Sequence, residues 1–252
     1  MFDKKIVPVV AILLLLAAVV AVGASQSRPV GVPPGEIVES PNARTTGDVP
    51  RPQVPEAPAL PASDMQVVFS DDFAKTSLDS WQTVETAEGT WVAHEGRLLQ
   101  GGDSNGDPAD DDALFVAKDV VFTDGMLDAA IYPTSGSPVG LAFRGSGAGY
   151  YRVVLTRKDS TETPKVALEK VTADGIRNVA SAPVTTWAGF TNGEWQSVSV
   201  KAVDSQITVS VNGKTVIETS DSTYTSGWAG IYSWADMGSQ VDNVRIQLVA
   251  GR

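Results

Sequence analysis

The sequence predicts an all-β fold, a two-sheet antiparallel jelly-roll sandwich, and three observations support it. After Asp64 the chain is a succession of short alternating segments, and none keeps a helical period for three turns. Asn212-Gly213 and Asp174-Gly175 separate pairs of such segments, and both dipeptides favour the type I′ turn of a hairpin. About fifteen strands in some 185 residues are too many for one immunoglobulin-like sandwich, and two smaller sandwiches are the alternative.

The expected strands follow one another along the chain with turn residues between them. In order they are 66–70, 81–84, 90–93, 97–100, 113–117, 125–132, 139–144, 150–157, 165–171, 176–182, 195–202, 206–211, 214–219, 227–232 and 242–249.

Two segments of different composition precede this domain, which we place at residues 65–252. Lys4 and Lys5 come before an apolar run from Ile6 to Ala24, which predicts an apolar helix that enters a membrane. Residues 1–24 form either a cleaved signal peptide or a retained single-pass anchor. In both cases the positive charges place the rest of the chain outside the cytoplasm. Residues 25–64 contain nine of the 15 prolines, which predicts a disordered, extended linker.

The overall composition excludes several kinds of function. A formal charge of −11 and a pI near 4.5 oppose binding to nucleic acid, whose phosphates require basic residues. The chain has no cysteine, so it forms no disulfide and no thiolate metal site. His94 is its only histidine, and we expect that side chain to be exposed or structural rather than catalytic.

The segment from Gly140 to Leu155 is the first candidate for function, because two strands flank a glycine-rich connection there. Alternation along these strands places Arg144, Tyr150 and Arg152 on one outward face. Glu169 of a neighbouring strand is expected on the same face. This face is either a binding surface for an acidic or polyhydroxyl ligand, or a surface on which the charges neutralise one another.

From residue 66 to residue 250 the chain resembles the concanavalin A-like lectin/glucanase superfamily, in particular its LamG-like and carbohydrate-binding modules. The resemblance rests on FSDDF (Phe69–Phe73) with Ser80-Trp81, on TWVAHEGRL, on GLAFR followed by YYRVVL, on VALEKV, on the strand beginning at Trp195, on VSVNGKTV, and on GIYSWADMGSQVDNVRI. It implies a jelly-roll sandwich whose relatives bind sugars, hydrolyse them or adhere to proteins.

Two departures from enzymes of this superfamily concern catalysis. Retaining glucanases carry an E-x-D-x-x-E strand, and the nearest spacing in this chain is Glu85 with Glu88, without the intervening aspartate. The GLAFR hairpin is similar to that of 3-keto-disaccharide hydrolases. Their G-Y-E-V-Q strand is replaced in this chain by Gly149-Tyr150-Tyr151-Arg152-Val153.

Two groups of oxygen ligands suggest a structural calcium ion. Asp103, Asn105 and Asp107 alternate in an acidic loop, although the loop lacks the glycine and the final glutamate of an EF-hand. The resemblance implies a second calcium site near the chain ends, at Asp71, Asp72 and Asp242. A solvated acidic loop and the capping of turns by aspartate are the respective alternatives.

Aromatic residues in or beside loops predict a sugar-binding platform formed by Trp187, Tyr232 and Trp234, with packing as the alternative role. We therefore expect a non-catalytic, monomeric module that binds a glycan or a cell-surface polysaccharide. It is held outside the cell on its linker, and it contacts the membrane through residues 1–24 if they are retained. A glycoside hydrolase-like enzyme and a LamG-type protein-adhesion module are the alternative functions.

Overall fold

The computed structural model describes residues 64–84, 91–100, 112–133, 138–156, 165–183, 194–234 and 239–251. The chain divides into two units, 1–49 and 50–252, and all described residues belong to the second. The expected signal or anchor and nearly all of the linker therefore lie outside the described residues. In the described part, no helix is long and apolar enough to cross a membrane.

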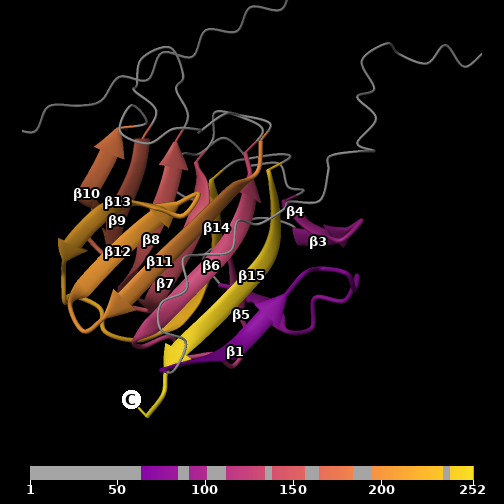
Figure 1. The fold of residues 1–252 in the computed structure, drawn as a ribbon, viewed down its shortest axis with the longest axis horizontal. Helices are drawn as coiled ribbons and strands as arrows, with labels where there is room; N and C mark the ends of the chain where they lie inside the picture. The colour runs from indigo at the N-terminus through magenta and orange to yellow at the C-terminus, as the bar shows by residue number, and fades with distance from the viewer. Residues whose placement is uncertain are drawn as a thin grey trace, which may run out of the picture. The chain divides into compact units, whose positions relative to one another are not determined.

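The described residues form two antiparallel sheets that pack face to face as a sandwich, and they contain no helix (Figure 1). Sheet A has the order β13-β12-β11-β6-β15-β4-β3, with β1 paired to β15, and sheet B has the order β10-β9-β8-β7-β14-β5-β2. The strands of sheet A are β1 (Met65–Asp71), β3 (Trp91–His94), β4 (Arg97–Gln100), β6 (Gly125–Tyr132), β11 (Gln196–Val203), β12 (Gln206–Val211), β13 (Lys214–Ser220) and β15 (Gln240–Val249). Those of sheet B are β2 (Trp81–Thr83), β5 (Asp112–Ala117), β7 (Val139–Ser146), β8 (Gly149–Thr156), β9 (Lys165–Thr172), β10 (Gly175–Pro183) and β14 (Trp228–Trp234). The predicted fold class is confirmed.

The two hairpins predicted from turn chemistry are present, and one differs in detail. Asn212 and Gly213 have φ angles of 50° and 73°, as the type I′ turn between β12 and β13 requires. The turn between β9 and β10 lies one residue earlier than expected. Gly175, with φ of 108°, is already the first residue of β10 and pairs with Thr172.

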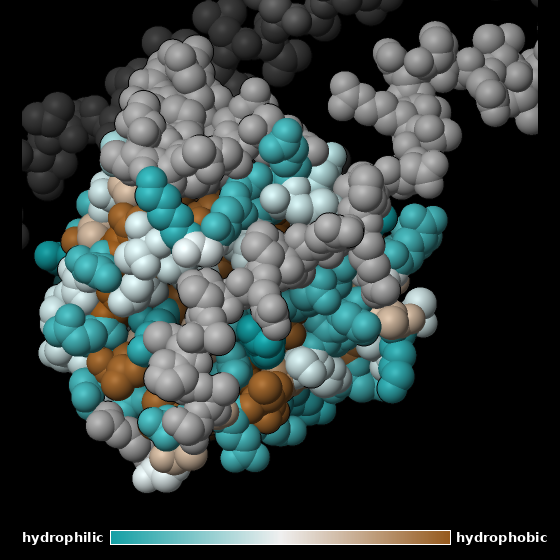
Figure 2. Space-filling model, in the orientation of Figure 1, coloured by the Kyte–Doolittle hydropathy of each residue, from teal (hydrophilic) through white to brown (hydrophobic). Residues whose placement is uncertain are grey.

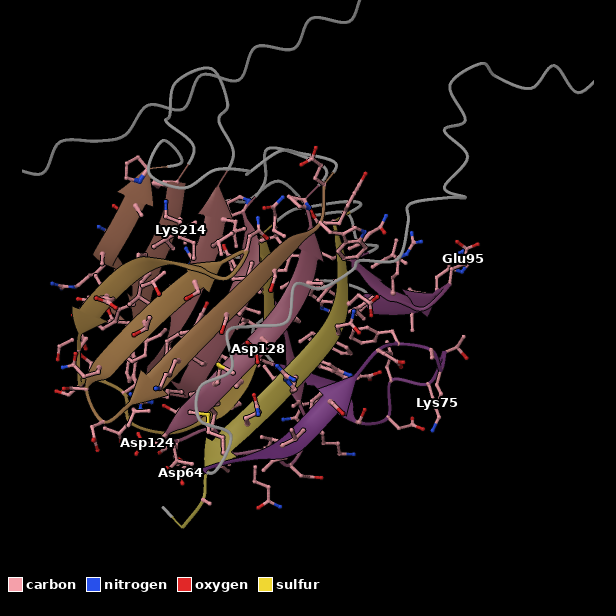
Figure 3. All side chains as sticks on the ribbon, in the orientation of Figure 1. Asp64, Lys75, Glu95, Asp124, Asp128 and Lys214 are labelled. Carbon is pink, nitrogen blue, oxygen red and sulfur yellow. The ribbon has the colours of Figure 1, made fainter. Side chains whose placement is uncertain are left out.

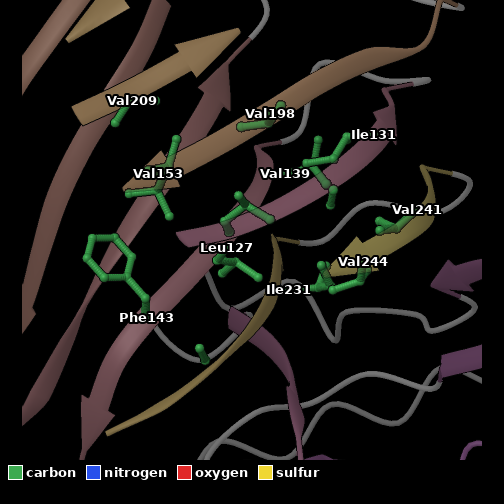
Figure 4. Close-up of a cluster of buried hydrophobic side chains, with 14 of the residues drawn as sticks. Leu127, Ile131, Val139, Phe143, Val153, Val198, Val209, Ile231, Val241 and Val244 are labelled. Atoms are coloured by element: carbon green, nitrogen blue, oxygen red, sulfur yellow. The ribbon is translucent and has the colours of Figure 1, made fainter. Parts of the chain in front are cut away.

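The core lies between the two sheets and is formed by alternate residues of their inner faces. Leu127 and Val198 from sheet A meet Val153 and Ile231 from sheet B, and all four side chains are fully buried (Figure 4). On the molecular face seen in Figure 2, hydrophobic residues are scattered among hydrophilic ones, as on most protein surfaces. The sandwich thus has one large core between its sheets. A second, smaller buried cluster lies on the other face of sheet B and consists of Leu114, Ala142, Tyr150, Val154 and Tyr232.

The first and last strands of the domain are neighbours, as expected. β1 pairs with β15 from Met65↔Val249 to Asp71↔Val244. The backbone carbonyl of Asp64 accepts a hydrogen bond of 2.8 Å from the amide of Ala250. These contacts attach the first strand of the domain to its last strand.

Candidate functional site

The predicted hairpin between Gly140 and Leu155 is formed by β7 and β8, which lie in the middle of sheet B. Its strands extend further than expected, so that only Gly147 and Ala148 remain at the tip, between Ser146 and Gly149. Leu141 of β7 is buried on the inner face opposite Val153 of β8, as alternation predicted. Four of the expected binding residues lie on or beside this hairpin.

Arg144 is not on the outward face, and the prediction that it shares this face with Tyr150 and Arg152 is wrong. The register between β7 and β8 shifts after Phe143, and Arg144 itself has a φ of 52°. Such a β-bulge inserts one extra residue and reverses the alternation beyond it. The Arg144 side chain is only 1% exposed, so it is not available to a ligand.

Arg144 instead ties together several backbone segments at one end of the sandwich. Its Nε donates to the carbonyl of Thr123 at 3.0 Å, and its Nη1 donates to that of Asp204 at 2.9 Å and, less closely, to that of Tyr224 at 3.4 Å. Its Nη2 lies 3.0 Å from Oδ1 of Asp124, which also accepts the amide of Asp204. Burial lowers the pKa of the guanidinium, and the neighbouring carboxylate of Asp124 opposes that shift. The role of Arg144 is therefore structural.

The outer face of sheet B brings together Tyr150, Arg152 and Glu169, as alternation predicted. Tyr232, which was expected in or beside a loop as part of a sugar platform, instead lies within β14 on the same face and is only 1% exposed. Arg152 lies directly opposite Glu169 in the β8–β9 register, and its Nε donates to Oε2 of Glu169 at 2.8 Å. The Arg152 guanidinium also stacks on the ring of Tyr232, 4.5 Å from its centroid. This ion pair is less exposed than predicted, because the two side chains are 7% and 18% exposed.

Trp228 is a further member of this face that sequence reasoning missed. Its ring centroid lies 5.1 Å from that of Tyr150, and its side chain is only partly buried. The ring lies over Gly145, where an added Cβ would come within 2.4 Å of it. The glycine at position 145 was the available signal, because a small residue opposite an aromatic residue leaves room for a flat ring.

A second polar cluster joins the two sheets at the same end as Arg144. The hydroxyl of Tyr151 donates to Oδ1 of Asp221 at 2.5 Å, and Nζ of Lys170 donates to Oδ2 at 2.7 Å. Burial alone would raise the pKa of Asp221, but hydrogen bonds from Lys170, Thr223 and Tyr151 hold it far below its usual range. Burial and the bond to Asp221 raise the pKa of Tyr151. The cluster fixes the connection that leads from β13 to β14.

On the outer face of sheet A, Asp128 of β6, labelled in Figure 3, forms a charged pair with Arg245 of β15. The Nη2 atom of Arg245 lies 3.4 Å from Oδ2 of Asp128. Burial raises the pKa of the Asp128 carboxyl, and hydrogen bonds from Ser199 and the charge of Arg245 offset part of this shift. Asp128 therefore holds its proton to a higher pH than an exposed aspartate does.

The carboxylates expected to bind calcium near the chain ends make local hydrogen bonds. Asp71 accepts the amide of Phe73 through Oδ1 and the indole of Trp81 through Oδ2, both at 2.8 Å. Asp72 accepts the amide of Ala74 at 3.1 Å, and Asp242 accepts the amide of Asn243 at 2.7 Å. These bonds are the turn-capping alternative, and the described residues contain no group of three or more metal-ligating side chains.

Several other sequence predictions fall on residues about which the structure says little. Asp103, Asn105, Asp107, Glu85, Glu88 and Trp187 lie outside the described residues, and Trp234 is described only as the last residue of β14. His94 is exposed, and its Nε2 lies 3.5 Å from Oε1 of the exposed Glu95.

The two sheets and their order define the class of the protein, a concanavalin A-like jelly-roll sandwich. Within that class the chain belongs to the family of 3-keto-alpha-glucoside-1,2-lyase-like domains, whose model matches residues 67–247. Among curated proteins, no relative matches the sequence.

Solved structures with the same fold include both binding modules and enzymes. A galectin-like protein of unknown function from Bacillus subtilis has a TM-score of 0.58 and 14% identity, over 74% of this chain and 97% of its own. SCLam, a non-specific endo-beta-1,3(4)-glucanase of family GH16, has a TM-score of 0.55 and 14% identity, over 77% and 94%. The carbohydrate-binding module CBM66 from Bacillus subtilis has a TM-score of 0.50 and 16% identity, over 68% and 92%. The fold is thus one used by carbohydrate-binding modules and by glycoside hydrolases.

Proposed function

We propose that the domain is a non-catalytic carbohydrate-binding module whose ligand lies on the outer face of sheet B. The observation that carries this proposal is the partly exposed Trp228 ring, which lies against Tyr150 on the sheet face that also holds the Arg152–Glu169 ion pair. An aromatic ring covers the apolar face of a pyranose, and planar charged groups bond its hydroxyls. The fold similarity to a carbohydrate-binding module supports the same function.

The described part of this face favours binding over hydrolysis. Glycoside hydrolases flank the scissile bond with two carboxyl groups, about 5 to 9.5 Å apart according to mechanism. Among the outward side chains described on sheet B, Glu169 is the only carboxylate, and it is hydrogen-bonded to Arg152. A single paired carboxylate does not supply the acid and the base that hydrolysis requires.

A glycan array probed with the full chain tests this function. We expect the chain to retain at least one uncharged glycan, and Trp228→Ala to weaken that binding about tenfold, which corresponds to about 1.4 kcal/mol. Arg177→Ala is the matched control, because Arg177 is exposed and makes only a 4.0 Å contact with Asp174. An array on which the parent chain retains no glycan would reject the proposal.

An enzyme of the 3-keto-glycoside class is the second candidate, because the family model that matches residues 67–247 bears the name of a lyase. A 1,2-elimination beside a ketone removes the proton at C2, breaks the glycosidic C1–O bond and returns a proton to the leaving oxygen. One carboxylate can take the first proton and deliver the second, and Glu169 is the described candidate on this face. Incubation with 3-keto-disaccharides, followed by chromatography of the products, separates the two functions. We expect no turnover. Turnover that Glu169→Gln abolishes would establish the enzyme instead.

We further propose that the module acts outside the cell on the proline-rich linker. The basic residues before the apolar run and the nine prolines that follow support this placement. Fractionation of cells that produce the full chain tests it, with the mass of the mature protein distinguishing a cleaved signal from a retained anchor. A full-length protein in the cytoplasmic fraction would contradict it.

A further inference from the structure

Two parallel rows of side chains cross the outer face of sheet B, roughly at right angles to its strands. The apolar row consists of Trp228 on β14, Tyr150 on β8, Val171 on β9 and Ile176 on β10. Tyr150 pairs with Val171 and Val171 with Ile176 in the sheet register, and the Trp228 ring reaches Tyr150 across β7. The row is therefore continuous over five neighbouring strands.

The second row, the polar row, lies beside the first on three of the same strands. Arg152 pairs with Glu169, and Glu169 pairs with Asn178. Because side chains on one face of a strand recur every second residue, the two rows are separated by about 6.8 Å. Arg152 is nearly buried, so a ligand lying on the apolar row would have the partly exposed Glu169 and the exposed Asn178 along one side.

The two ends of the apolar row are at least partly exposed, whereas its middle, at Tyr150, is buried. Ile176 is 54% exposed at the β10 edge, although a large aliphatic side chain gains by burial. Trp228 and Val171 are partly exposed, whereas Tyr150 is 8% exposed and supports the Trp228 ring from beside it. Contact surface is therefore available at both ends of the row, on β14 and on β9–β10.

The length and charge of the rows select a class of ligand. Neighbouring strands lie about 4.8 Å apart, so the four spacings from β14 to β10 span about 19 Å, more than two pyranose rings. The two charges of the polar row lie 2.8 Å apart and neutralise each other. Neither row therefore offers an uncompensated cation to a uronate or a sulfate group.

We propose that the ligand is an extended, uncharged polysaccharide chain that crosses the strands from β14 to β10. Its sugar rings lie on the apolar row and its hydroxyls face the polar row. This inference rests on the proposed glycan-binding function and adds the length, direction and charge of the ligand. The Trp228 end is expected to hold one sugar unit, and the Ile176 end to be reached only by a longer chain.

Calorimetry of the full chain with gluco-oligosaccharides of one to six units tests the proposal, with galacturonate oligomers of equal length for comparison. For each series we expect the Kd to fall with length until about four units and then to level. The neutral oligomers should bind about tenfold more tightly than the acidic ones. Where the glycan array selects another neutral sugar, its oligomers replace the glucose series.

Two exposed residues provide a test variant and its matched control, Ile176 within the apolar row and Val121 outside it. Ile176→Ser should weaken the hexasaccharide about three- to tenfold and leave the disaccharide unchanged. Val121→Ser, at a position that is 60% exposed and outside both rows, should change neither. A disaccharide that binds as tightly as the hexasaccharide, or a hexasaccharide insensitive to Ile176→Ser, would overturn the proposed ligand while glycan binding itself stands. A chain that binds no glycan at all would remove both proposals.

Discussion

Replacement of Arg144 by alanine is expected to destabilise the domain strongly without removing its glycan site. The guanidinium is fully buried and holds three backbone carbonyls and the Asp124 carboxylate. Truncation removes the guanidinium donor from these carbonyls and removes the cation beside Asp124, whose Oδ1 keeps the hydrogen bond from the Asp204 amide. The Arg144→Ala variant therefore distinguishes a structural role of Arg144 from the ligand-binding role that the sequence predicted.

The size of the effect follows from the bonds that are lost. Hydrogen bonds to a charged group contribute about 1.5 to 3 kcal/mol each, and they are not additive because they share one guanidinium. Breaking a buried ion pair by removing one partner costs about 3 to 5 kcal/mol. We therefore expect Arg144→Ala to lower the free energy of unfolding by about 4 kcal/mol, or the Tm by about 10 °C in a domain of this size.

Urea unfolding followed by tryptophan fluorescence measures this change, and the glycan array measures the binding of the variant at a temperature where it is folded. Arg177→Ala, with its exposed 4.0 Å contact to Asp174, should alter stability by less than about 0.5 kcal/mol. Unchanged stability of Arg144→Ala combined with lost glycan binding would refute the structural role and restore Arg144 to the ligand site.

Three further predictions concern titration and metal binding. Asp221→Asn should cost about 3 kcal/mol at neutral pH. Because the pKa of Asp221 is lowered in the folded state, its contribution to the free energy of unfolding is lost as the pH falls below about 4. The free energy of unfolding of the variant, measured in urea, should therefore decrease less steeply at acid pH than that of the parent. An equally steep decrease would contradict this. Asp128→Asn should have the opposite pH dependence, because burial raises the pKa of Asp128 in the folded state. The parent chain should therefore lose stability as the pH rises from about 4 through that raised pKa, and the variant should not lose it. If calcium binds as the acidic residues suggest, it should raise the Tm and EDTA should lower it, whereas identical melting curves would reject every calcium site.

The sequence was sufficient for the fold because its signals were local and repeated. Alternation and turn residues predicted fifteen strands, and each has a counterpart among the described strands. The Asn212-Gly213 turn is at the predicted position because both residues adopt the positive φ that this dipeptide favours. The turn predicted at Asp174-Gly175 lies one residue earlier in the structure, because Gly175 also fits at the first position of a strand.

The candidate site was predictable only where alternation is uninterrupted. Tyr150, Arg152 and Glu169 lie on regular parts of β8 and β9, so counting by twos placed them correctly. Arg144 lies in a bulge and itself has the positive φ. An arginine at that position does not indicate a bulge in the sequence. Trp228 was missed because its place depends on Gly145, a contact between strands that lie far apart in the sequence.

The proposed function requires a glycan to contact the outer face of sheet B at Trp228. The six tryptophans each give one indole N–H signal in a two-dimensional NMR spectrum, and Trp228→Phe assigns the relevant one. Titration with a bound oligosaccharide should shift the Trp228 signal. The signal of Trp81, whose indole is hydrogen-bonded to Asp71 beside the core, should stay in place. Saturable glycan binding that leaves the Trp228 signal unmoved would contradict the proposed contact.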